Sequence, residues 1–175
     1  MNYRYIGEFN TDSIVAKLKD ITQEDWEAFN FRQDNFNVHH QTLTIPLFYY
    51  WYVDDLLLAG DEKWTKLFND ELHLVKDIGY NAYGKGGMIR CILVKLAAGG
   101  RICQHIDTKM SPEANAIHRV HIPIITNDDV IFKIGGELKN MKKGECWEIN
   151  NLEKQHGVNN YSSVDRIHLI FDYET

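Results

Sequence analysis

From Met88 onward, the chain alternates short apolar segments with clusters of turn residues. The apolar segments have the length and the β-branched and aromatic content of strands, and Gly, Asn and Ser separate them. Many short strands at this spacing are typical of a β-sandwich or a small β-barrel. The expected strands cover residues 89–96, 102–106, 119–126, 130–134, 146–149, 157–158 and 167–173.

The segment before this region contains helix signals. Residues 61–78 repeat apolar side chains at helical spacing, which predicts an amphipathic helix with Asp61 as its N-cap and Gly79 as its C-cap. Thr22 is followed three residues later by Asp25, which approximates a capping box and predicts the start of another helix. We expect these helices to pack on the outside of the β-structure.

A further strand is expected at residues 36–51, where apolar and polar side chains alternate. Pro46 within it favours an edge position or a bulge, because proline has no N–H to donate to a neighbouring strand. The fold class is therefore mainly β with flanking helices. We predict a single domain over residues 1–175, with a helical and strand support region at 1–85 and a β core at 86–175.

Composition excludes several classes of protein. The chain has 175 residues, a formal net charge of −6 and no basic run, which disfavours a nucleic-acid partner. No apolar stretch approaches the length of a membrane span, and no apolar leader opens the sequence. The cysteines are odd in number and widely spaced, which indicates free thiols and a cytoplasmic location.

A candidate metal site begins at His105 and Asp107. Residues two apart in a strand point to the same face, so this imidazole and this carboxylate would project together. His156 could supply a third ligand. Two histidines and one carboxylate on one face of an octahedron leave three positions open, as in non-haem Fe(II) oxygenases.

Arg166 is the candidate anion-binding residue. It stands directly before an apolar strand, where an unpaired charge is costly, so it needs an anionic partner. A planar guanidinium suits a carboxylate, and Arg166 would lie near His156 if the two occupy adjacent antiparallel strands. Arg119 and His121 form a second pair at strand spacing and could line the same pocket.

Two further features concern aromatic residues and a pair of histidines in the first half of the chain. The aromatic run Phe48–Tyr52 is interpreted as a packed wall, with a substrate-facing wall as the alternative. His39 and His40 are adjacent, so at most one of them could face the site if they lie in a strand. His40 is the candidate substrate contact.

Taken in order, these motifs resemble the aspartyl/asparaginyl β-hydroxylase family. The resemblance implies a double-stranded β-helix, a jelly-roll and cupin relative, in residues 86–175. It implies an Fe(II)- and 2-oxoglutarate-dependent dioxygenase that uses O2 to hydroxylate an amino-acid side chain. It assigns iron to His105, Asp107 and His156, and 2-oxoglutarate to Arg166 with Arg119 and His121. The motifs are His105-x-Asp107, Arg119-Val-His121-Ile-Pro, Gly144-Glu-x-Trp147, His156-Gly-Val-x-Asn160 and Arg166-Ile-His-Leu-Ile-x-Asp172.

Two alternatives use the same ligands. A cupin-type barrel could hold a metal for small-molecule binding or isomerisation, without a need for Arg166. A zinc hydrolase is the other, since His and Asp also bind zinc.

Overall fold

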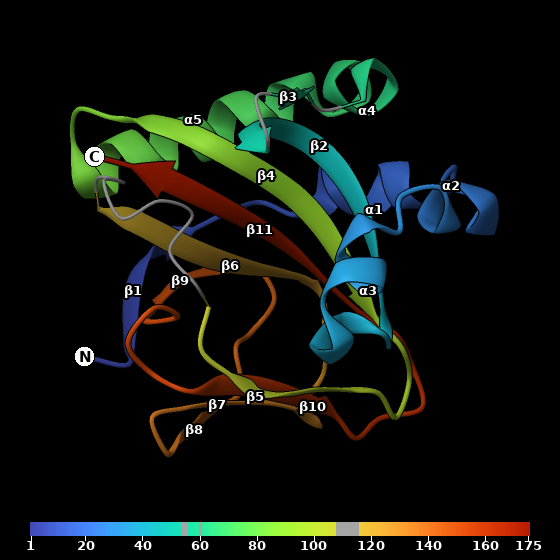
Figure 1. The fold of residues 1–175 in the computed structure, drawn as a ribbon, viewed down its shortest axis with the longest axis vertical. Helices are drawn as coiled ribbons and strands as arrows, with labels where there is room; N and C mark the ends of the chain where they lie inside the picture. Colours follow the sequence, from blue (N-terminus) through green and yellow to red (C-terminus); the bar gives the residue numbers. More distant parts are fainter. Residues whose placement is uncertain (54–55, 60, 108–115) are drawn as a thin grey trace.

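The computed structural model describes residues 1–53, 56–59, 61–107 and 116–175. Within these residues, two antiparallel sheets face each other (Figure 1). The larger sheet has the order β1 (Tyr3–Glu8), β9 (Glu145–Ile149), β6 (Ile117–Ile125), β11 (Arg166–Glu174), β4 (Gly87–Leu96), β2 (Thr42–Val53) and β3 (Leu56–Ala59). The smaller sheet has the order β5 (Arg101–His105), β10 (His156–Asn160), β7 (Val130–Ile134) and β8 (Glu137–Lys139).

The chain passes back and forth between the two sheets as it runs from β4 to β11. β4, β6, β9 and β11 lie in the larger sheet, and the strands between them in sequence lie in the smaller one. This alternation is the double-stranded β-helix, so the predicted fold class is confirmed. The strands predicted from residue 88 onward correspond to β4–β7 and β9–β11, whereas β3 and the short β8 were not predicted.

The larger sheet is covered on both faces, which explains its near-continuous apolar strands. In β4, Cys91 and Leu93 pack toward the helices, while Ile92 and Val94 belong to a separate cluster on the opposite face. Alternate residues of a strand project to opposite faces, so one strand supplies both clusters. The interior between the sheets adds Phe132, Ile134 and other residues of the smaller sheet.

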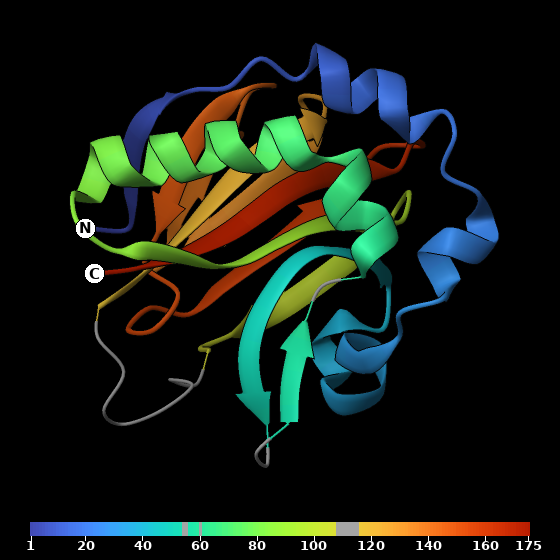
Figure 2. The same ribbon diagram turned by 90° about the horizontal axis from the view of Figure 1, so that it is seen from above.

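The predicted helix at residues 61–78 is two helices, α4 (Glu62–Leu67) and α5 (Asn69–Tyr83), which meet at Phe68. α5 runs along the outer face of the larger sheet (Figure 2). Asp61 is the N-cap as predicted, since its side chain accepts a hydrogen bond from the Lys63 N–H at 2.8 Å.

The prediction that Gly79 caps this helix is wrong. α5 continues past Gly79 to Gly84, whose φ of +81° ends it. Gly79 is instead a packing position, because a Cβ atom there would lie 2.3 Å from the Tyr173 ring. The glycine lets the helix approach β11 closely.

Three shorter helices and a 3₁₀ turn precede β2: α1 (Asp12–Leu18), α2 (Gln23–Glu27), α3 (Phe31–Asn35) and η1 (Asn37–His39). The predicted capping box of Thr22 and Asp25 is present at the start of α2. The strand expected from residue 36 begins only at Thr42, because α3 and η1 occupy the preceding segment. The predicted bulge is confirmed, since the β2–β4 register shifts between Pro46 and Phe48.

The first 85 residues contribute strands to the larger sheet, which also contains strands of the β core. β1 pairs with β9, and β2 pairs with β4, so this region contributes strands as well as covering helices. None of the helices in the described ranges has the length and apolarity needed to cross a membrane.

Candidate active site

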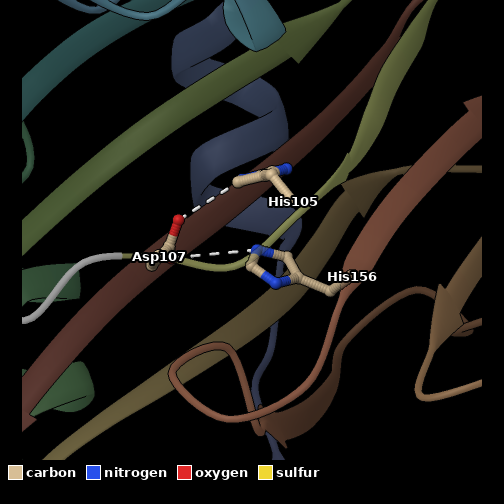
Figure 3. A group of neighbouring side chains, drawn as sticks. All are labelled: His105, Asp107 and His156. Carbon is tan, nitrogen blue, oxygen red and sulfur yellow. Dashed lines mark ion pairs between the residues drawn. The ribbon is translucent and has the colours of Figure 1, made fainter.

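Three potential metal ligands meet at one end of the smaller sheet. His105 ends β5, His156 begins β10, and the two residues are direct partners in the β5–β10 ladder. Asp107 lies just beyond the end of β5, where its N–H donates to the Asn151 carbonyl at 3.0 Å. The candidate ligand atoms of the three residues all lie within 4.8 Å of one another, and the side chains converge (Figure 3).

Backbone carbonyls orient both imidazoles. Nδ1 of His105 lies 2.8 Å from the Cys103 carbonyl, and Nδ1 of His156 lies 3.3 Å from the Lys154 carbonyl. A carbonyl oxygen only accepts, so each Nδ1 carries a proton, and in the neutral form of each ring Nε2 keeps a free lone pair. The Nε2 atoms lie 3.3 Å and 3.8 Å from the Asp107 carboxylate.

Gly157 allows β10 to approach β5 this closely. A Cβ atom at this position would lie 2.8 Å from the Ile102 carbonyl oxygen. The β5–β10 register also shifts between His156 and Val158. The glycine that follows His156 in the sequence is therefore required by the packing that places the two imidazoles together.

A network of charged side chains holds Asp107. Arg119 contacts its carboxylate, and Asn151 donates to it at 2.8 Å. Arg119 also contacts both oxygens of the fully buried Asp172, at 2.8 and 3.0 Å, and Arg90 contacts Asp172 at 2.8 Å. Arg119 and Asp172 are facing residues of β6 and β11, so the sheet register builds this contact.

The electrostatics of the triad favour a charged Asp107 carboxylate and a neutral His156. The pKa of His105 is raised, because the effect of burial is outweighed by its hydrogen bonds to Asp107 and the Cys103 carbonyl. Burial opposes ionisation of Asp107, but the Arg119 charge and the His105 hydrogen bond hold its pKa well below the usual range. Burial, together with the neighbouring His105, lowers the pKa of His156 to about 4. A neutral imidazole and an ionised carboxylate are the forms that bind a metal ion.

Arg166 lies across the cavity from the triad. Its side chain is 1% exposed, and none of its guanidinium nitrogens has a hydrogen-bond partner among the described residues. The guanidinium lies 5.1 Å from the centre of the Phe132 ring. Burial, together with the charge of Arg32, lowers the pKa of Arg166 to about 9.

The expected adjacency of His156 and Arg166 is wrong. His156 begins β10 in the smaller sheet, and Arg166 begins β11 in the larger one. The turn between the two strands carries the chain from one sheet to the other, so the two residues border one cavity from opposite sides.

Two buried histidines lie beside Arg166. His121 is 7% exposed and lines the cavity, and its Nδ1 has no partner within the described ranges. His168 is fully buried, and neither of its ring nitrogens has one. The His168 ring stacks on Phe132 at 5.5 Å and meets His121 at 5.7 Å.

His39, and not the predicted His40, lies beside the triad. His39 is buried beside His105, with ring centres 5.6 Å apart, whereas His40 is exposed and contacts the Asn37 carbonyl. The strand assumption failed because this segment forms η1. Of the aromatic run, Tyr49 is buried in the cluster with Ile92, and the side chains from residue 50 onward lie outside the described part.

Several residues at the site were not predicted from the sequence. Arg32, Arg90, Asn151 and Asp172 have no chemical motif of their own. Only Asp172 stood in a quoted pattern, and only the sheet register reveals its partners. Only the folded structure shows that Arg32, which lies on α3, lines the cavity.

Other proteins with solved structures share this double-stranded β-helix fold. The 2-oxoglutarate-Fe(II) oxygenase family protein from Burkholderia pseudomallei superposes with a TM-score of 0.55, at 14% identity over 98% of this chain and 93% of the other. A Pseudomonas putida prolyl-4-hydroxylase gives a TM-score of 0.59, at 10% identity over 98% and 90%. A viral collagen prolyl hydroxylase from Paramecium bursaria Chlorella virus-1, solved with 2-oxoglutarate, gives 0.60, at 8% identity over 100% and 97%. At these identities the likeness establishes the fold.

The family follows from the sequence match. The aspartyl/asparaginyl β-hydroxylase family matches residues 8–175, and the chain therefore belongs to that family. The match begins well before residue 86, the predicted start of the β core, and before His105, where the first motif lies. No curated protein sequence matches the chain significantly.

Replacing Asp172 with Asn should destabilise the protein by about 3–5 kcal/mol, because Arg90 and Arg119 would be left as buried cations without their shared carboxylate. The free energy of unfolding from urea titration measures this. Asp128→Asn is the matched control, since its partner Lys142 is exposed and little change is expected. Equal stability of the two variants would contradict a structural role for the Asp172 contacts.

Proposed function

We propose that the protein is an Fe(II)- and 2-oxoglutarate-dependent dioxygenase that hydroxylates an amino-acid side chain, free or within a peptide. The observation that carries this proposal is the buried guanidinium of Arg166, which has no partner among the described residues and borders the cavity that also contains the triad. A buried cation without a counterion is costly, so a protein that keeps one has a use for an anion there.

The triad fits Fe(II). His105, Asp107 and His156 offer two neutral imidazoles and one carboxylate, a donor set with which Fe(II) retains open positions. Bound Fe(II) would supply the redox chemistry that couples reduction of O2 to oxidative decarboxylation of 2-oxoglutarate. In the balanced reaction, one oxygen atom enters succinate, the other becomes the substrate hydroxyl, and CO2 is released.

Arg166 would pair with the carboxylate of 2-oxoglutarate that is remote from the keto group. His121 is proposed to assist as a hydrogen-bond donor, and His168, whose ring nitrogens have no partner among the described residues, has one N–H donor nearby. Val94, Phe132 and Ile170 provide apolar walls to the cavity. These walls exclude water and strengthen the contact between carboxylate and guanidinium.

Arg119 is proposed to act on the metal ligand as well as on the co-substrate. It was predicted to help bind 2-oxoglutarate, and it does border the cavity. Its contacts with Asp107 and Asp172 also fix the position of the Asp107 carboxylate. We also propose a cytoplasmic location, which the three free cysteines support, because reducing compartments preserve thiols.

The alternatives explain less of the structure. A cupin-type metal barrel and a zinc hydrolase would both use the triad, but neither requires a buried cation beside it. Arg166 therefore favours the dioxygenase over both.

Succinate formation tests the proposed function. With Fe(II), ascorbate, 2-oxoglutarate and air, the wild-type protein should release succinate, and a panel of amino acids and short peptides should contain members that accelerate it. His156→Ala should lose bound iron and at least about 99% of turnover, because a ligand is missing. His73→Ala is the control, since His73 is exposed on α5. Iron bound without any succinate would favour the cupin-type barrel.

Arg166→Met should separate co-substrate binding from folding. Because Arg166 has no partner within the described protein, removing its charge should leave the melting temperature of the ligand-free protein unchanged or higher. The same change should abolish stabilisation by 2-oxoglutarate in the metal-loaded protein. Thermal unfolding with and without 2-oxoglutarate measures both effects.

Arg119→Met is the matched comparison, and it should lower the melting temperature, since it leaves Asp107 and Asp172 without their shared cation. A large loss of stability in Arg166→Met would show that Arg166 has a structural role instead.

A further inference from the structure

A second hollow opens outward from the triad. It is lined partly by aromatic and apolar side chains of α3 and η1, the elements that lie beside β5 at the end of the sandwich (Figure 1). The inner cavity continues to Arg166, whereas the outer hollow does not include that residue. The residues common to both are Arg32, His39, Arg90, His105, Asp107 and Arg119.

Arg32 lies where the two hollows join. It comes from α3, and one of its terminal nitrogens lies 3.0 Å from Nε2 of His39 while the other donates to the Thr44 hydroxyl at 3.5 Å. No carboxylate pairs with it among the described residues. Burial, then the charges of Arg90 and Arg119, lower the pKa of Arg32 to about 9.

The charges around the cavity do not balance. Among the described residues, four arginines border it and two carboxylates compensate them, which leaves an excess of two positive charges (four minus two). Fe(II) would add two positive charges and 2-oxoglutarate two negative ones, so the excess persists with both bound. The groups counted are Arg32, Arg90, Arg119 and Arg166 against Asp107 and Asp172.

The two uncompensated cations have different environments. Arg166 lies at the inner end, where the proposed co-substrate carboxylate would neutralise it. Arg32 faces the outer hollow, whose rim carries Phe36 and Ile106, which are 44% and 49% exposed. Large apolar side chains beside a cation suit an organic anion with an apolar portion.

We infer that the substrate carries a carboxylate that pairs with Arg32, and that Arg32 determines specificity for that group. This inference rests on the proposed function, because it assigns the outer hollow to the substrate and the inner cavity to 2-oxoglutarate. Arg32 uses two of its donors within the protein, and a guanidinium offers five, so donors remain for a carboxylate. The substrate body would lie against Phe36 and Ile106.

Binding to the metal-loaded protein tests the inference without turnover. Redox-inert Mn(II) replaces iron, and calorimetry measures the affinity for amino acids, dicarboxylic acids and short peptides, with and without 2-oxoglutarate. Each acid is paired with the amide that removes its carboxylate charge. At least one acid should bind about 10- to 100-fold more tightly than its amide, as expected for a charge-assisted contact.

Variants then assign the effect to Arg32. Arg32→Gln should remove the preference for the acid over the amide and leave affinity for Mn(II) and 2-oxoglutarate within about twofold. Arg32→Lys should restore part of the preference, because it keeps the charge but loses the planar fork. Arg101→Gln is the control, since Arg101 is exposed and lies outside both hollows.

The outcomes separate the two proposals. A panel in which no acid binds more tightly than its amide, or a preference that survives in Arg32→Gln, would overturn the role of Arg32. Failure of the Mn(II)-loaded wild-type protein to bind 2-oxoglutarate would reject the proposed function. In that case, the comparison of acid and amide on the protein with metal alone still decides whether Arg32 binds a carboxylate.

Discussion

The Asp172 carboxylate links the candidate active site to the larger sheet through its ion pairs with two arginines. It is fully buried in β11 and accepts contacts from Arg90 on β4 and Arg119 on β6, the two strands that flank β11. Arg119 in turn contacts Asp107, which lies beyond the end of a strand and has little regular structure to hold it. One buried anion thus connects three strands of the larger sheet to Asp107, the candidate metal ligand that follows β5 of the smaller sheet.

A second constraint is the contrast between paired and unpaired cations within one cavity. Arg119 on β6 is neutralised by two carboxylates, whereas Arg166 at the start of β11 has none among the described residues. Both lie in a medium where charge is costly, so the pairing decides their roles. The paired cation belongs to the framework, and the unpaired one is available for an anionic ligand.

Much of the fold and the triad could be predicted from the sequence, because strand periodicity and turn residues are local signals. The pattern from β4 to β11 was visible in this way, and so were His105, Asp107 and His156. The placement of Arg166 opposite His156 was missed, because the change of sheet between β10 and β11 depends on long-range pairing. Roles that depend on a partner distant in sequence, such as that of Arg32, have no local signal. Gly79 was wrongly predicted to end a helix, because the reason for a glycine there is the close approach of Tyr173, which is distant in sequence.

The central claim is that Arg166 binds the far carboxylate of 2-oxoglutarate while the triad holds the metal that its keto end would approach. The most direct test compares 2-oxoglutarate with 2-oxovalerate, which has a methyl group in place of that carboxylate, by calorimetric titration of the Mn(II)-loaded protein. We expect 2-oxoglutarate to bind at least about 30-fold more tightly than 2-oxovalerate, because the buried charge pair with Arg166 is lost with the analogue. Equal affinity for the two compounds would contradict it.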